Sequence, residues 1–182
     1  MPTTTTTRRV VAVGAAVAAG AAFVSPARAA TIATHEGDGS CVIRVVGQEG
    51  SGAFVTGEPV CFGTLAEALE SVGASGPVAR AVRSDRELAT LAAASGSGTI
   101  AVHFDGANRT GASIVVTGAD CGGGYLNLST DWVNRISSTL NSCSNTRFFD
   151  GYDKSGTQEG TNLGTVNLGP LNNAANSVLY GT

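Results

Sequence analysis

The alternation of apolar and polar residues predicts a β-hairpin at the start of the patterned part of the chain. Residues 41–46 are rich in β-branched side chains, and a Gly-Ser-Gly break follows at 50–52. Residues 53–56 then return to a strand-like composition before the chain reaches Cys61. Apolar runs bounded by glycine in this way are typical of two antiparallel strands joined by a turn.

A short helix is expected directly after this hairpin. Thr64 and Glu67 form a capping box, in which the threonine hydroxyl accepts from the third helical N–H and the glutamate reaches back. Leu69 and Val72 continue the apolar spacing of one helical face. A second capping box, at residues 84–87, predicts a weaker helix further along.

The rest of the chain contains an internal repeat. Residues 104–111 (FDGANRTG) align with residues 149–156 (FDGYDKSG), with four identical positions. Each copy follows an apolar strand-like run, and its Asp-Gly step predicts a tight turn. The last glycine of each copy, Gly111 or Gly156, can adopt a positive φ or let two backbones approach closely.

A second repeated block follows each turn. Residues 132–138 (WVNRISS) align with residues 171–177 (LNNAANS). Each copy therefore predicts a strand, a tight turn, a strand, a loop and a strand. Because neither copy can bury both faces of its strands alone, we expect two Greek keys that share one core. The predicted fold is mainly β, with these two motifs forming one sandwich after a small hairpin-plus-helix segment.

The first 29 residues have the composition of a secretory signal peptide. Arg8 and Arg9 precede an uncharged apolar run over 10–24, and residues 27–29 (ARA) form a cleavage motif. The apolar run is too short for a comfortable membrane span. The expected organisation is a signal peptide at 1–29, a small α+β segment at 30–95, a linker at 96–98 and a β domain at 99–182. Whether the segment at 30–95 packs on the β domain or hangs loosely from it is left open.

The charge of the chain excludes some classes of function. The 182 residues carry a formal net charge of −3, and removal of residues 1–29 leaves 153 residues with a net charge of −6. An acidic chain does not suit nucleic-acid binding through general basicity. No second run of 18 apolar residues follows the leader. We therefore expect a secreted, extracellular protein with neither nucleic acid nor a membrane as a partner.

All four cysteines lie outside the predicted leader: Cys41, Cys61, Cys121 and Cys143. An even number in an exported chain predicts two disulfides. Three pairings are possible, and the sequential one is favoured because each bridge then closes a short local loop. A bridge over a ~20-residue loop restricts the unfolded chain by roughly 3 kcal/mol. Zinc is improbable, because there is no C-x-x-C pair and neither histidine has ligand spacing to a cysteine.

The repeated blocks resemble the βγ-crystallin fold, particularly small secreted actinobacterial members that include metalloproteinase inhibitors. The Greek key of that family opens with an aromatic residue, a turn and a glycine, as at 104–111 and 149–156. It closes with an Asn/Asp-rich block that ends in serine, as at 134–138 and 172–177. The resemblance covers residues 99–182. The chain departs from it in one place, where Arg109 and Lys154 replace the second aromatic residue.

Many members of that family bind calcium through two Asn/Asp residues, two free positions, then Ser/Thr and Ser. Here Val133 occupies the first of these positions in one copy, and Asn176 occupies the Ser/Thr position in the other. Neither block contains a carboxylate, and neutral ligands alone make weak calcium sites. We therefore expect no cofactor, with weak calcium binding as the alternative. Otherwise four side chains of the blocks are expected only to hydrogen-bond the turns: Asn134, Ser138, Asn173 and Ser177.

Catalytic patterns are scarce, so no enzymatic activity is expected. His103 lies beside an aromatic residue on a predicted strand, where a lone histidine is more often structural than a general base. His35 belongs to the segment that follows the leader. Asp105 and Asp150 hold equivalent turn positions; paired carboxylates could serve glycoside hydrolysis, but repeat-equivalent residues usually lie apart. No phosphate-binding loop or nucleophile elbow is found.

Proteinase inhibition, chiefly of a metalloproteinase, is the leading hypothesis, with an extracellular protease as the partner. It rests on the family resemblance. The candidate region runs from Gly118–Gly124 to Cys143, because it contains two cysteines and is longer than its repeat partner. A rigid loop loses little entropy when it binds a protease.

Two alternatives are kept. A carbohydrate or cell-wall binding module would use exposed aromatic side chains, and a calcium-stabilised structural or stress protein would use the motif above. The aromatic candidates are Tyr125, Trp132, Tyr152 and Tyr180. Trp132 better suits the core, because its repeat partner is Leu171.

Overall fold

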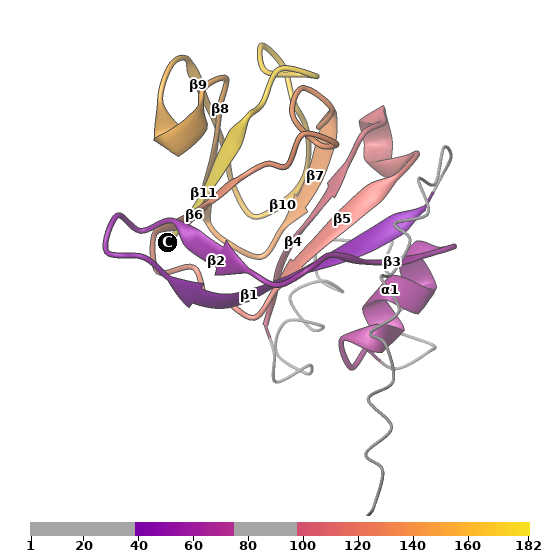
Figure 1. Cartoon of the computed structure of the whole chain (residues 1–182). Helices are drawn as coiled ribbons and strands as arrows, with labels where there is room; N and C mark the ends of the chain where they lie inside the picture. Colours follow the sequence, from indigo (N-terminus) through magenta and orange to yellow (C-terminus); the bar gives the residue numbers. More distant parts are fainter. Residues whose placement is uncertain (1–38, 75–97) are drawn as a thin grey trace, which may run out of the picture. The chain divides into compact units, whose positions relative to one another are not determined.

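The structure is a computed structural model that describes residues 39–74 and 98–182 (Figure 1). The predicted signal peptide at 1–29, the capping box at 84–87 and residues 96 and 97 of the linker lie outside the described residues. The elements are β1 (Ser40–Gln48), β2 (Phe54–Thr56), β3 (Val60–Phe62), α1 (Leu65–Ser71), β4 (Thr99–Phe104), η1 (Ala107–Arg109), β5 (Ser113–Thr117), β6 (Gly124–Asn127), β7 (Ser138–Asn141), β8 (Asn145–Phe149), η2 (Tyr152–Lys154), β9 (Gln158–Thr161), β10 (Gly164–Asn167) and β11 (Ser177–Gly181).

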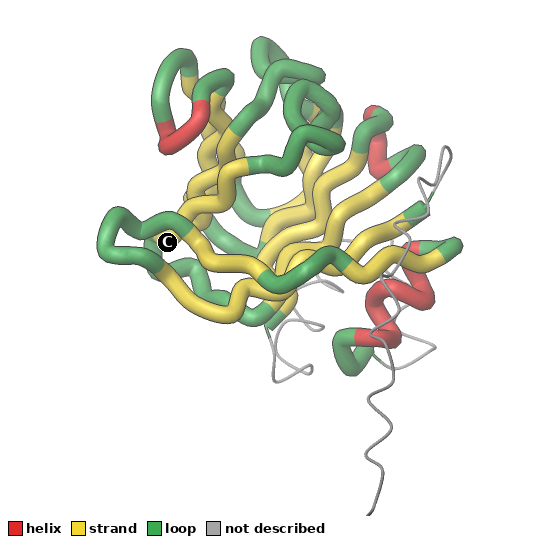
Figure 2. Tube along the Cα trace, viewed as in Figure 1, coloured by secondary structure: helices red, strands yellow, loops and turns green. Residues whose placement is uncertain are grey.

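The strands form two sheets, so the expectation of a mainly β fold is confirmed (Figure 2). One sheet has seven strands, in the order β10-β7-β4-β5-β1-β2, with β3 also paired to β1. The other has four strands, in the order β6-β11-β8-β9. Apolar side chains from both sheets meet in one buried cluster, which includes Ile114, Ile136, Phe148, Val178 and Tyr180. Each sheet therefore buries one of its faces against the other.

The predicted hairpin is present and belongs to the larger sheet. Strand β1 pairs antiparallel with both β2 and β3, and Cys41 lies opposite Cys61, to which it is joined by a disulfide. The other edge of β1 pairs in parallel with β5, from Ser40 opposite Ser113 to Arg44 opposite Thr117. Of the two arrangements that the sequence left open, the structure therefore has the packed one. The described residues all belong to one compact unit.

Helix α1 covers part of the outer face of the seven-stranded sheet. Its capping box is confirmed: the Thr64 hydroxyl accepts from the Glu67 N–H at 3.2 Å, and the Glu67 carboxylate accepts from the Thr64 N–H at 2.9 Å. Leu69 is fully buried and belongs to a second apolar cluster, together with Val42 of β1 and Val115 of β5. None of the helices in the described ranges has the length and apolarity needed to cross a membrane.

Each repeat copy contributes four strands, and the prediction of three was wrong. Copy one comprises β4 to β7, and copy two comprises β8 to β11. The missed strands, β6 and β10, are four residues long and begin with glycine. Segments this short do not contain enough residues to show the alternation of apolar and polar positions that identifies a strand. Each joins the sheet of the opposite copy: β6 pairs with β11, and β10 pairs with β7. The predicted tight Asp-Gly turns are also longer than expected, because each contains a single 3-10 turn.

The exchanged strands bind the turn of the opposite copy through matching side chains. Asn167 of β10 exchanges two hydrogen bonds with Asn108, at 2.7 and 2.8 Å. Asn127 of β6 exchanges two with Asp153, at 2.9 and 2.8 Å. Both Asn108 and Asp153 have left-handed backbones, with φ of 55° and 56°. The two copies are thus interlocked by the same polar contact made in both directions.

Candidate functional site

Asp105 and Asp150 hold equivalent positions in the two repeated turns, but their carboxylates have different partners. Asp105 accepts a 2.6 Å ion-pair contact from the Arg135 guanidinium, while Asp150 accepts from the backbone N–H of Thr157 at 2.7 Å. The two carboxylates follow β4 and β8, which belong to different sheets. Each carboxylate therefore has its own partner, and neither of these contacts joins the two acids as a pair.

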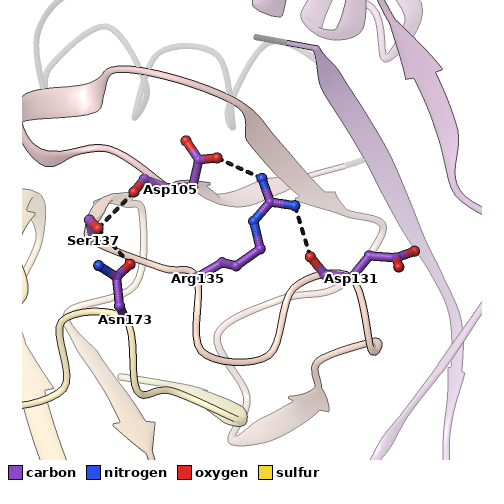
Figure 3. A network of polar contacts seen from close by, with 5 residues as sticks. All are labelled: Asp105, Asp131, Arg135, Ser137 and Asn173. Atoms are coloured by element: carbon purple, nitrogen blue, oxygen red, sulfur yellow. Dashed lines mark hydrogen bonds and ion pairs between the residues drawn. The ribbon is translucent and has the colours of Figure 1, made fainter. Parts of the chain in front are cut away.

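A network of polar contacts surrounds Asp105 (Figure 3). The Arg135 guanidinium contacts the Asp105 carboxylate and also donates to the Asp131 carbonyl oxygen at 3.0 Å. The Ser137 hydroxyl lies 2.7 Å from the Asp105 carbonyl oxygen and 2.9 Å from the Asn173 amide oxygen. Ser137 and Asn173 come from different repeat copies, so this network also crosses between the copies.

The corresponding place in copy two is built differently. Ala174 stands where copy one has Arg135, so no guanidinium is available there. Asn176 replaces Ser137 and donates from its amide nitrogen to the Asp150 carbonyl oxygen at 2.6 Å. Its amide oxygen is buried without a hydrogen-bond partner within the described part of the chain. The two repeat copies therefore carry different side chains, with different hydrogen-bonding groups, at this aligned position.

These side chains do not fit a calcium ion well. The oxygens that meet at the copy-one turn belong to the side chains of Ser137 and Asn173 and to the backbone of Asp105. These oxygens are uncharged and are already joined by hydrogen bonds. The positively charged Arg135 guanidinium also lies beside them. Calcium instead favours a set of oxygens that includes carboxylates. Ser138 and Ser177 bind turn backbone, at 2.6 Å to Gly106 and 2.7 Å to Gly151. Across residues 39–74 and 98–182, no cluster of three His, Cys, Asp or Glu side chains could hold a metal ion.

His103 is fully buried between the sheets, within a chain of hydrogen bonds. Its Nδ1 lies 2.8 Å from the Thr139 hydroxyl, and its Nε2 lies 2.8 Å from the Tyr180 hydroxyl. The Thr139 hydroxyl donates its single hydrogen to Asn141, so it must accept from Nδ1–H, and Nε2 is then left to accept from Tyr180. Desolvation by burial lowers the pKa of His103 to about 3 and raises the pKa of Tyr180. These contacts describe a neutral structural histidine.

The aromatic candidates for sugar binding are mostly buried. Tyr125, Trp132 and Tyr180 expose 4%, 7% and 0% of their surface, whereas Tyr152 is 46% exposed. Trp132 lies in the inter-sheet core, as its repeat partner suggested, and the Arg135 guanidinium stacks over it 5.1 Å from the ring centroid. A stacking platform made of several aromatic rings is therefore not available from these four residues.

The Gly118–Gly124 loop is fixed at several points. Cys121 is bridged to Cys143, which is fully buried, and the two disulfides have the sequential pairing that the sequence favours. The backbone N–H of Gly123 donates to the Tyr180 carbonyl oxygen at 2.9 Å, and the N–H of Gly122 donates to the Asp120 carboxylate at 2.8 Å. The disulfide and the Gly123 hydrogen bond thus fasten this loop to Cys143 and to β11.

Sequence reasoning did not single out a second exposed segment, Val55–Cys61. It runs from the end of β2 through the connection at 57–59 into β3, at the edge of the seven-stranded sheet, and Cys61 at its end is exposed and bridged to Cys41. Val55 and Val60 are 43% and 57% exposed. Only Cys61 and Pro59 could have drawn attention to this segment in the sequence, because exposure of valine depends on which residues the fold places over it.

Comparison with protein-family models, with curated proteins and with solved structures found no match to this chain.

Proposed function

We propose that the chain is a secreted, non-enzymatic, disulfide-stabilised βγ-crystallin-like protein that inhibits an extracellular protease, most specifically a metalloproteinase. The observation that carries the proposal is that each disulfide fastens an exposed segment, in one case a sheet edge and in the other a loop, to a packed strand or to the core. Cys61 is tied to β1 through Cys41, and Cys121 is tied to the buried Cys143. A segment held in this way binds with little loss of conformational entropy, which favours tight inhibition.

The strand order supports the family part of this proposal. In the seven-stranded sheet the order β5-β4-β7-β10 combines the second, first and fourth strands of copy one with the third strand of copy two. The four-stranded sheet has the order β9-β8-β11-β6, which is the same combination with the copies exchanged. In each sheet the first strand of a copy lies beside its fourth strand, as in a Greek key, and this placement supports the proposal. Protease inhibition enters the proposal because residues 104–111 and 149–156 resemble a family that includes metalloproteinase inhibitors.

The disulfides also support an extracellular location. Bonds between Cys41 and Cys61 and between Cys121 and Cys143 persist in a non-reducing environment and are rare in the cytosol. Secretion through the leader at 1–29 belongs to the proposal.

Titration of purified protein against a thermolysin-like metalloprotease and a subtilisin-like serine protease tests the inhibitory function. We expect loss of protease activity in proportion to added protein, with an end point near one inhibitor per enzyme. The control is the same protein with both disulfides reduced and alkylated, which should inhibit poorly because its exposed segments are no longer fastened. Full protease activity at stoichiometric excess of the native protein would reject the proposal.

A further inference from the structure

The Val55–Cys61 segment carries an aliphatic surface beside its disulfide. Five large apolar side chains of the described residues are well exposed, and two of them, Val55 and Val60, lie in this segment. A third, Val46 of β1, lies alongside: its side chain is within 4 Å of the position that a Cβ on Gly57 would occupy. Three of these five exposed apolar side chains thus belong to β1 and to the edge segment that pairs with it, which ends at Cys61.

The two ends of this segment pair with β1, and its middle bulges from the sheet. Thr56 lies opposite Val45, and Val60 lies opposite Val42, so three residues of the edge face two residues of β1. The extra residue makes a bulge, which one hydrogen bond secures: the Gly57 N–H donates to the Arg44 carbonyl oxygen at 2.9 Å.

Two covalent features limit the freedom of the bulge. Pro59 fixes its own φ and keeps the preceding residue, Glu58, in an extended conformation. The disulfide from Cys61 to Cys41 then fixes the end of the segment against β1. An exposed, extended and restrained backbone is the form in which a protease cleft takes a peptide, and restraint reduces the entropy lost on binding.

The Gly118–Gly124 loop lacks a side chain for an apolar pocket. Its exposed residues are Gly118, Asp120, Gly122 and Gly123, while Ala119 and Cys121 are half-buried. Val60, in contrast, is more than half exposed at the end of the bulge. Of the two disulfide-fastened segments, only Val55–Cys61 can fill a pocket that selects aliphatic residues.

We infer that the Val55–Cys61 segment enters the cleft of the target protease and that Val60 fills its principal specificity pocket. The partner is therefore an extracellular protease whose pocket takes an aliphatic side chain. This inference rests on the proposed inhibitory function. A bulge and a proline also protect a sheet edge from pairing with another edge, and if they serve only that purpose, Val60 will not affect inhibition.

The test compares inhibition constants for a thermolysin-like protease among wild type, Val60→Leu, Val60→Asp and the control Leu163→Asp. Leu163 is 59% exposed and lies between β9 and β10, so the control places the same charge at a similarly exposed aliphatic position. We expect Val60→Asp to weaken inhibition roughly tenfold to a hundredfold, because an apolar pocket rejects the carboxylate. The inhibition constant of Val60→Leu should stay within about threefold of the wild-type value. The control Leu163→Asp should have the same inhibition constant as wild type.

Unchanged inhibition by Val60→Asp would overturn the inference while leaving inhibition itself established. A large loss in Asp120→Lys with none in Val60→Asp would also overturn it, and would place the reactive region in the Gly118–Gly124 loop. If wild type inhibits no protease, the proposed function fails first. Thermal melts check that each variant is folded. We expect that they are, because the altered side chains, at Val60, Asp120 and Leu163, are all exposed.

Discussion

The hydroxyl of Tyr180 lies 2.8 Å from Nε2 of His103, and this hydrogen bond joins β11 of one sheet to β4 of the other. The chain of donors continues from His103 to Thr139, from Thr139 to Asn141 and from Asn141 to Thr161. All five residues are buried, so each hydrogen bond satisfies a polar group that could not otherwise reach water. The direction of the chain fixes the proton of His103 on Nδ1.

His103 is expected to stay neutral in the folded protein well below its ordinary pKa. Burial lowers this pKa to about 3, whereas the unfolded chain titrates near 6.5. The unfolded state therefore binds the extra proton between these values. Stability from this group is fully present above pH 6.5 and falls as the pH drops toward 3, by up to about 1.4 kcal/mol per pH unit.

Nuclear magnetic resonance of the His103 ring measures this directly. Its carbon and nitrogen shifts should report a neutral ring with the proton on Nδ1 and should not titrate between pH 8 and 4.5. A transition near pH 6.5, or a ring protonated on Nε2, would contradict the hydrogen-bond chain.

Tyr180→Phe is expected to destabilise the fold by roughly 1–3 kcal/mol, because it leaves the buried Nε2 of His103 without a donor. Tyr152→Phe serves as the control, since Tyr152 is 46% exposed. It should change the free energy of unfolding by less than about 0.5 kcal/mol. Urea denaturation compares the two variants; equal stabilities would count against the importance of the His103–Tyr180 contact.

Gly111→Ala and Gly156→Ala are expected to destabilise both repeat turns. These glycines have φ of 80° and 82°, and a Cβ on either would collide with the carboxylate of Asp105 or Asp150. We expect a loss of more than about 1 kcal/mol for each. Gly160→Ala is the control, because its Cβ would meet nothing within 4 Å. Calorimetric melting temperatures that fall as little for the turn variants as for Gly160→Ala would contradict this prediction.

Calcium is expected to leave the thermal stability of the protein unchanged. At the copy-one turn the Arg135 guanidinium already pairs with Asp105, and the hydroxyl of Ser137 is hydrogen-bonded. A site with millimolar affinity would add roughly 1 kcal/mol of stability at about 5 mM calcium. Melts in calcium, in magnesium and in chelator should therefore coincide. A calcium-specific rise of the midpoint would restore the calcium-stabilised alternative.

The sequence predicted the features that depend on neighbours along the chain. The capping box of Thr64 and Glu67, the hairpin that holds Cys41 and the left-handed glycines at 111 and 156 all follow from local backbone chemistry. The repeat added that both copies would share a core, because neither could bury its strands alone.

The features that were missed depend on contacts between distant residues. The short strands β6 and β10 exist because each finds an edge in the sheet of the opposite copy. The parallel pairing of β1 with β5 joins residues more than 70 positions apart, as does the contact of His103 with Tyr180. The exposure of Val60 is likewise decided by what packs around it, so no local pattern indicates it.

Native mass spectrometry of the protein mixed with a thermolysin-like protease distinguishes an inhibitor from a substrate or a bystander. We expect a 1:1 complex that persists for hours and from which the inhibitor is recovered with both disulfide loops intact. Digestion of the chain into fragments without a complex, or two free proteins at micromolar concentration, would contradict it.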